Sequence, residues 1–192
     1  MNKFFLSFLL LGIVINANCQ ERFTDSRDGA IYRVVTINGT AWMADNLKFN
    51  AGTGSVYFNN DVKNANYGLL YDWKTAVKAC PDGWRLPSGT DFRNLSNHFQ
   101  DYESWERQSG GMKSFTIQLG GMQDNQGIFS EMDESAYYWT SIEYNADNAE
   151  YFSYLIINEI IIVDISREAD IEDIHGTDKN DKYSVRCVKT SQ

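Results

Sequence analysis

The chain has little proline, histidine and cysteine, and fewer basic than acidic residues. Its 192 residues include only 2 Pro, so no proline-rich linker divides it, and its length suits one domain with a real core. The 17 Lys and Arg against 26 Asp and Glu give a formal net charge of −9. Because an acidic surface repels phosphate groups, we expect no nucleic-acid partner and no binding to anionic membrane surfaces.

Motifs of the common enzyme classes are also missing. The chain has no Gly-x-Ser-x-Gly, no His-Glu-x-x-His and no glycine loop that cradles phosphates. His98 ends a predicted helix and His175 stands alone in an acidic loop, so we interpret both as structural or surface residues. We therefore expect a protein that is not an enzyme and has no cofactor. The alternative is an extracellular polysaccharide-acting hydrolase, because 26 acidic residues always allow some pair of carboxylates in space.

The N-terminus carries an apolar stretch with the form of a signal peptide. Lys3 precedes Phe4–Ile15, which is too short to span a bilayer comfortably. Residues 1–19 are predicted to be the signal peptide, with cleavage after Cys19, so the mature chain has no transmembrane segment and is secreted to the extracellular space or the cell surface. The alternative is cleavage before Cys19 and its lipidation, as in an outer-membrane lipoprotein.

The two remaining cysteines are predicted to form a disulfide. Cys19 leaves with the signal or carries a lipid, which leaves Cys80 and Cys187 in an oxidising compartment. A bond between them would close a long loop, for which the chain-entropy model gives about 4–5 kcal/mol. Two thiols without a nearby histidine fit a zinc site or an activated nucleophile less well.

Local patterns predict a hairpin and a first helix. Ala30–Ala44 alternates on both sides of Asn38-Gly39, a dipeptide that favours a two-residue turn because both residues tolerate positive φ. Asp72 is placed to cap a helix over Trp73–Ala79, and Cys80-Pro81 ends it because the residue before proline leaves the helical region. The spacing predicts that the buried face of this helix is Trp73, Ala76 and Val77.

A second helix and a series of strands follow. Ser88 and Asp91 have the spacing of a capping box, which starts a helix over Gly89–Phe99 with Phe92, Leu95 and Phe99 buried. Gly120-Gly121 reads as a break between strands. The predicted strands are Ser114–Leu119, Ile128-Phe129, Ala136–Ser141, Tyr151–Ile157, Ile160–Ile165 and Tyr183–Val188. The order predicts an α+β fold with two short helices and antiparallel hairpins and strands, in which residues 20–27 are a leader and residues 28–190 one domain.

At Gly83-Trp84-Arg85-Leu86-Pro87 the chain resembles a bacterial secreted family, the Fibrobacter succinogenes major paralogous domain. The resemblance covers about Asp28–Lys189, nearly the whole predicted mature chain. Its motifs are Asp28-Gly29, Trp42-Met43-Ala44-Asp45-Asn46-Leu47, Tyr67-Gly68-Leu69-Leu70-Tyr71-Asp72-Trp73, Ala79-Cys80-Pro81-Asp82-Gly83-Trp84-Arg85-Leu86-Pro87, Leu119-Gly120-Gly121, Tyr138-Trp139-Thr140-Ser141 and Ser184-Val185-Arg186-Cys187-Val188.

The resemblance implies a C-type lectin-like fold, close to that of formylglycine-generating enzymes. In that fold a cysteine at the end of the first helix pairs with one in the last strand, which here are Cys80 and Cys187. The stretch between Tyr154 and Tyr183 departs from the family pattern, because it is rich in isoleucine and then acidic rather than rich in Asn and Ser. The family implies no established activity.

The sequence lacks the motifs for calcium-dependent sugar binding, which is the best-known function of this fold. Neither Glu-Pro-Asn nor Gln-Pro-Asp occurs, and Trp-Asn-Asp is absent. A different Ca²⁺ site remains a candidate, because hard cations prefer several oxygen ligands at short range. Its candidate ligands are Glu143, Asn145, Asp147 and Asn148.

The aromatic residues suggest one candidate contact for a ligand. Trp42, Trp73, Trp84 and Trp139 lie in family motifs and are interpreted as core. Trp105, in a polar loop with Tyr102, is the candidate for stacking on a sugar or a partner. The favoured hypothesis is a secreted binding or interaction module for an extracellular glycan or protein, with its variable surface on residues 121–135 and 145–181. A structural cell-surface assembly subunit is a further alternative.

Overall fold

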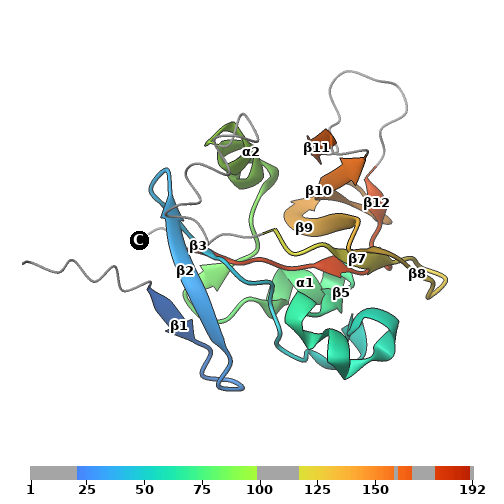
Figure 1. Ribbon diagram of the computed structural model, residues 1–192, viewed down its shortest axis with the longest axis horizontal. Coiled ribbons are helices and arrows are strands. Elements are labelled where there is room, and N and C mark those ends of the chain that lie inside the picture. Colours follow the sequence, from blue (N-terminus) through green and yellow to red (C-terminus); the bar gives the residue numbers. More distant parts are fainter. Residues whose placement is uncertain (1–20, 99–116, 158–159, 166–175, 191–192) are drawn as a thin grey trace, which may run out of the picture.

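The part of the chain that the structure describes has two β-sheets and two α-helices, and its C-terminal segment contributes a strand to each sheet (Figure 1). The computed structural model describes residues 21–98, 117–157, 160–165 and 176–190. Within these ranges the protein is mixed helix and sheet, and mostly β, in agreement with the α+β prediction. No helix in the described ranges is both long and apolar enough to cross a membrane.

The smaller sheet has five strands in the order β1-β2-β3-β14-β6. Its β2–β3 hairpin turns at Asn38 (φ 48°) and Gly39 (φ 79°), as the dipeptide predicts. Its strands are β1 (Arg22–Thr24), β2 (Ile31–Ile37), β3 (Thr40–Met43), β6 (Trp84–Arg85) and β14 (Val188–Lys189).

The larger sheet has nine strands and includes the main path β11-β10-β9-β13-β5-β4. Most pairings are antiparallel, but β13 and β7 each pair with β9 in parallel at one register position. Its strands are β4 (Ser55–Val56), β5 (Leu70–Tyr71), β7 (Gly120–Gln123), β8 (Phe129–Met132), β9 (Ser135–Glu143), β10 (Asn148–Ile157), β11 (Ile160–Ile165), β12 (Thr177–Asp178) and β13 (Tyr183–Ser184). Three short 3-10 helices lie between β3 and β5: η1 (Gly52–Gly54), η2 (Phe58–Asn60) and η3 (Val62–Tyr67).

Two strand predictions were wrong. Residues 117–119 are not strand, and the predicted break at Gly120-Gly121 is the start of β7. Gly121 belongs to the strand although its φ is 62°. A glycine pair predicts a turn, because glycine readily adopts the positive φ that turns require. The predicted strand Tyr183–Val188 is split by residues 185–187, because its two ends pair with different sheets.

Helix α1 (Trp73–Ala79) begins at the predicted cap, where the Asp72 carboxylate accepts a hydrogen bond from the Thr75 backbone N–H at 2.8 Å. Cys80, with ψ 141°, ends it before Pro81. The buried face is Trp73, Ala76 and Ala79, whereas Val77 is 36% exposed. The prediction for Val77 was therefore wrong: the helix turns its i, i+3, i+6 positions inward, which also brings Cys80 to the core.

Helix α2 (Gly89–His98) has the predicted capping box. The Asp91 N–H donates to Ser88 Oγ at 3.2 Å, and the Ser88 N–H donates to Asp91 Oδ2 at 2.7 Å. Phe92 and Leu95 are buried as expected, and Phe92 stacks on Phe152 at 4.5 Å between ring centroids. Phe99 lies outside the described residues.

The core divides into two clusters, one against each helix. The first surrounds α1 and includes Trp73, Trp84, Trp139 and Cys187, and the second lies against α2 and includes Trp42. The four tryptophans predicted to be core are all buried. Two of their indole N–H groups donate to backbone carbonyls, which removes the cost of burying them: Trp139 to Tyr71 at 2.6 Å and Trp73 to Thr140 at 2.9 Å.

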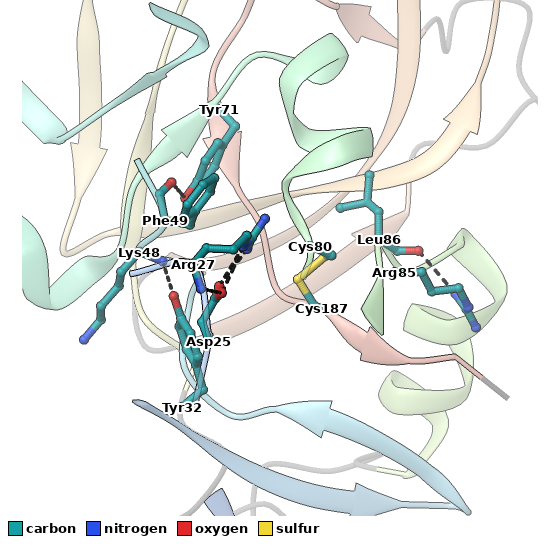
Figure 2. The surroundings of a disulfide bond; sticks show 10 residues. All are labelled: Asp25, Arg27, Tyr32, Lys48, Phe49, Tyr71, Cys80, Arg85, Leu86 and Cys187. Carbon is teal, nitrogen blue, oxygen red and sulfur yellow. Dashed lines mark hydrogen bonds and ion pairs between the residues drawn. A yellow bond between two sulfur atoms is a disulfide. The ribbon is translucent and has the colours of Figure 1, made fainter. Parts of the chain in front are cut away.

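The disulfide predicted between Cys80 and Cys187 is present, and the cysteines are 107 positions apart. It joins the end of α1 to the C-terminal segment (Figure 2). Beside it, the buried Asp25 carboxylate accepts hydrogen bonds from Arg27, whose guanidinium lies 3.7 Å from the centre of the Phe49 ring. These hydrogen bonds lower the pKa of Asp25, although its burial opposes them.

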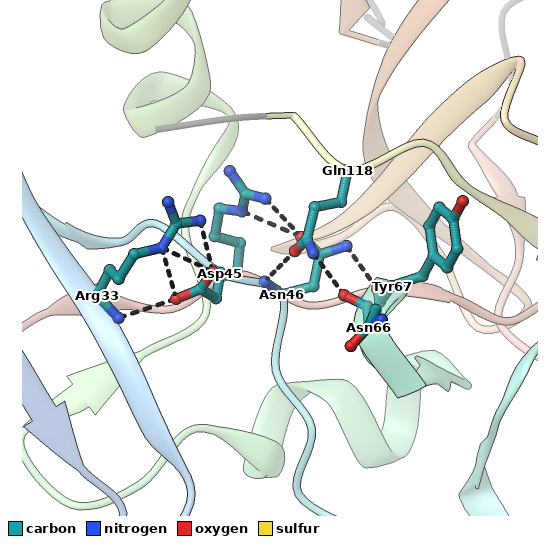
Figure 3. Close-up of polar contacts among 7 residues, drawn as sticks. Arg33, Asp45, Asn46, Asn66, Tyr67 and Gln118 are labelled. Atoms are coloured by element: carbon teal, nitrogen blue, oxygen red, sulfur yellow. Dashed lines mark hydrogen bonds and ion pairs between the residues drawn. The ribbon is translucent and has the colours of Figure 1, made fainter. Parts of the chain in front are cut away.

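Arg186, next to the disulfide in sequence, is buried and hydrogen-bonds to Asn46, whose contacts with Tyr67 and Gln118 are drawn in Figure 3. Its Nε and Nη2 donate to Asn46 Oδ1 at 3.1 and 2.7 Å, and its guanidinium lies 5.3 Å from the Tyr138 ring centre. Asn46 Nδ2 in turn donates to the Tyr67 carbonyl at 2.9 Å, and the Asn46 N–H donates to Gln118 Oε1 at 2.9 Å. This network holds four distant parts of the chain together, so we interpret Arg186 as a structural residue.

Candidate functional site

The candidate Ca²⁺ loop surrounds a lysine ammonium. Lys179 Nζ donates to Glu143 Oε1 at 2.6 Å, to the Ala146 carbonyl at 2.9 Å and to the Asn145 carbonyl. Only 4% of the Lys179 side chain is exposed, and its Nζ lies 4.9 Å from the Trp73 ring centre. The oxygens of this loop thus converge on a positive charge that the chain itself supplies.

The side chain of Asn145, another candidate ligand, serves the backbone of that loop. Asn145 Oδ1 accepts hydrogen bonds from the N–H groups of Asp147 at 2.9 Å and Asn148 at 2.8 Å. In the part of the chain that the structure describes, no group of three or more His, Cys, Asp or Glu residues is arranged to hold a metal ion.

The ligand-stacking candidates Trp105 and Tyr102 lie outside the described residues. Cys80 and Cys187 are committed to the disulfide. Within the described residues, the two predicted surface segments meet, because Asn125 Nδ2 donates to Asp178 Oδ2 at 2.8 Å. Next to this contact, Gln123 exchanges two backbone hydrogen bonds of 3.1 and 2.7 Å with Lys182, the residue after the second segment. The start of the β7–β8 hairpin and the chain between β12 and β13 therefore lie side by side (right of Figure 1).

A group of tyrosines lies where these segments meet the central strands. Tyr137 of β9 and Tyr151 of β10 are half-buried, with ring centroids 6.1 Å apart and planes 50° apart. Both rings contact Tyr183 of β13, at 5.2 and 5.3 Å between centroids. Tyr183 is itself buried and stacks on Trp139 at 4.5 Å, so the two outer rings rest on the core.

Acidic and hydroxyl groups flank these rings. The Tyr137 hydroxyl donates to Glu131 Oε2 at 2.6 Å, and the Tyr183 hydroxyl donates to Thr177 Oγ1 at 3.1 Å. Thr177 Oγ1 donates in turn to Asp181 Oδ2. We call Glu131, Tyr137, Tyr151, Thr177, Asp181 and Tyr183 together the tyrosine face.

Burial and nearby acidic groups both act on the titratable groups of the tyrosine face. Burial raises the pKa of Asp181, and the nearby charges of Asp178 and Asp124 raise it further. Burial likewise raises the pKa of Tyr137, to which the hydrogen bond to Glu131 adds, so this hydroxyl stays protonated and acts as a donor.

Sequence reasoning placed the ring-bearing positions of this face on strands but did not assign them to a site. Tyr137 and Trp139 alternate on β9, so they share one side of the strand, and Trp139 pairs with Tyr151 across the ladder. That alternation could have indicated that the two rings lie on one face of the sheet. The contact of Tyr183 with these rings could not be predicted from the sequence, because it depends on the parallel pairing of β13 with β9.

Fold and site together define a disulfide-linked α+β domain that presents an aromatic and acidic face on one sheet. The chain belongs to the Fibrobacter succinogenes major domain family, whose model matches residues 35–189. No curated protein and no solved structure matches the chain.

Proposed function

We propose that the protein is a secreted, non-enzymatic binding or interaction module on a C-type lectin-like scaffold, and that its ligand, an extracellular glycan or protein, binds the tyrosine face. The observation that carries this proposal is the pair of half-buried rings, Tyr137 and Tyr151, beside the contact between the two segments that are predicted to carry the variable surface. Aromatic rings that rest on a packed core offer a large contact area at little entropic cost.

Two features support the lectin-like scaffold. The disulfide joins the residue after α1 to the segment between the last two strands, and the strands at the two ends of the described chain, β1 and β14, belong to one sheet. The signal-peptide pattern of residues 1–19 supports secretion, and lipidation at Cys19 would instead place the domain at the outer membrane.

Binding rather than catalysis is favoured by the sequence, which carries no motif of the common enzyme classes. The carboxylates near the rings accept hydrogen bonds from hydroxyl groups: Glu131 from Tyr137, Asp181 from Thr177, and Asp133 from Tyr67.

The test is a screen of residues 20–192 against glycans and extracellular proteins, with and without Ca²⁺, followed by Tyr151→Ser and Glu131→Gln variants of the same chain. We expect any ligand found to lose affinity to both variants, while Val62→Ser, which changes a residue that is 65% exposed on η3, keeps it. Circular dichroism checks that each variant is folded. Unchanged affinity in folded Tyr151→Ser and Glu131→Gln would place the ligand elsewhere, and turnover of a bound glycan would favour the hydrolase alternative.

A further inference from the structure

We infer that the group recognised by the tyrosine face is a cation, namely the lysine or arginine side chain of a protein partner. This inference rests on the proposed function, since it names the ligand chemistry of the same surface.

Among the described residues, no ion pair neutralises Glu131 of the tyrosine face or the neighbouring Asp178. The hydrogen-bond donors to these two carboxylates are hydroxyl, amide and backbone N–H groups, none of which carries a positive charge. Elsewhere in the described chain, carboxylates such as Asp25, Asp45 and Asp91 are instead paired with arginines. The face thus keeps a negative potential that an approaching cation would find attractive.

The geometry of the two rings favours a compact cationic group. Tyr137 and Tyr151 are tilted by 50° rather than coplanar. A flat platform of coplanar rings suits successive sugar rings, whereas two inclined faces meet a compact group from two directions. A guanidinium or ammonium over an aromatic face is attracted by the ring electrons, and a carboxylate at the rim adds a charge-assisted hydrogen bond.

The net charge of the whole chain is complementary to a cationic partner. The net charge of −9 favours encounter with a basic partner and disfavours uronate, sulfate or phosphate ligands. Lys179, the buried lysine of the neighbouring turn, is committed to Glu143 and the carbonyls of its loop, so it does not neutralise the face.

The experiment uses residues 20–192 with ¹⁵N labelling and titrates an octapeptide of glycine with two arginines, a matched peptide with glutamines in their place, and cellohexaose. We expect the arginine peptide to shift the amide resonances of Tyr137, Tyr151 and Thr177, with an affinity that falls as salt is raised. The glutamine peptide should shift them far less.

Variants sharpen the assignment. Glu131→Gln should weaken arginine-peptide binding about 10- to 150-fold, the range expected for one charge-assisted contact. Asp82→Asn, which removes an equal charge from an exposed turn outside the tyrosine face, should leave it unchanged. An equal loss in both variants would mean unspecific attraction to the acidic chain and would overturn the inference.

The remaining outcomes separate the two proposals. If cellohexaose shifts the tyrosine face and the arginine peptide does not, the binding surface stands and its cationic ligand is wrong. If the arginine peptide leaves the resonances of the face in place, the inference fails, whatever the ligand screen finds.

Discussion

Replacing Lys179 by methionine tests whether an internal cation holds the loop between β9 and β10. Methionine keeps the apolar stem that packs beside Trp73 but removes the ammonium. The loop then loses the donor to the Asn145 and Ala146 carbonyls and to Glu143. The Lys179 backbone also links this loop to α1, because its N–H donates to the Asp147 carbonyl and its carbonyl accepts from the Trp73 N–H.

The magnitude follows from the burial of each partner. Glu143 is 59% exposed, so water replaces the ammonium there and the ion pair itself contributes about 0–1 kcal/mol. The hydrogen bonds to the two carbonyls come from a charged, buried donor, and bonds of this kind contribute about 1.5–3 kcal/mol. The contact with the Trp73 ring adds about 0.5–1 kcal/mol. Because the two carbonyl bonds share one ammonium, we count them once, and we expect Lys179→Met to lower the free energy of unfolding by about 2–5 kcal/mol.

Urea unfolding followed by tryptophan fluorescence measures this change. Glu143→Gln should cost less than about 1 kcal/mol, and Lys189→Met, at an exposed position of β14, should stay within about 0.5 kcal/mol of the parent. Equal losses in Lys179→Met and Glu143→Gln would show that the exposed ion pair, not the buried carbonyl contacts, stabilises the loop, and a loss below about 1 kcal/mol in Lys179→Met would refute the reasoning altogether.

Three further predictions concern the disulfide, a glycine and a carboxylate. Replacing Cys80 and Cys187 together by alanine should lower the free energy of unfolding by about 4–5 kcal/mol, because the bond closes a loop of 107 positions, and a loss under about 1 kcal/mol on urea unfolding would contradict it. Gly121→Ala should lower the free energy of unfolding by about 2–4 kcal/mol, because at φ 62° its Cβ would lie 2.3 Å from the Ser130 carbonyl oxygen. Gly127→Ala has a comparable positive φ but no backbone nearby, so it should lower this free energy by only about 1–2 kcal/mol. Equal losses in the two variants would disprove the clash. The raised pKa of Asp181 means that the folded state binds this proton more tightly, so its stabilising effect is full below about pH 4 and is lost as pH rises through the folded pKa. Relative to Asp181→Asn, the parent should therefore become less stable between pH 4 and pH 7, and a difference that stays constant over this range would argue against the shift.

Features that depend on neighbours in sequence were predictable. The Asp72 cap, the Ser88 and Asp91 capping box and the Asn38-Gly39 turn all use hydrogen bonds or backbone preferences within four residues. Such features leave a signature in sequence because the residue types at fixed spacing are themselves the cause.

Features that depend on pairing between residues far apart in the sequence were not predictable. Val77 was expected to be buried, but the orientation of α1 is set by the residues that pack against it. Cys80 and its partner Cys187 pack on the core side of α1, and Val77 is left exposed. The β7 strand begins at a glycine pair because Gly121 closely approaches the backbone of β8. Tyr183 reaches Tyr137 through a parallel contact between strands more than 40 residues apart. Sequence separation of this size leaves no local pattern.

The C-terminal segment has a consequence for the order of folding during synthesis. β13 lies between β5 and β9, and β14 lies between β3 and β6, so each of these strands lacks an inner neighbour until residues 183–189 are made. The disulfide also waits for Cys187. A nascent chain that ends before Tyr183 can therefore form its local hairpins and helices, but both sheets are completed only when the C-terminal segment has been made.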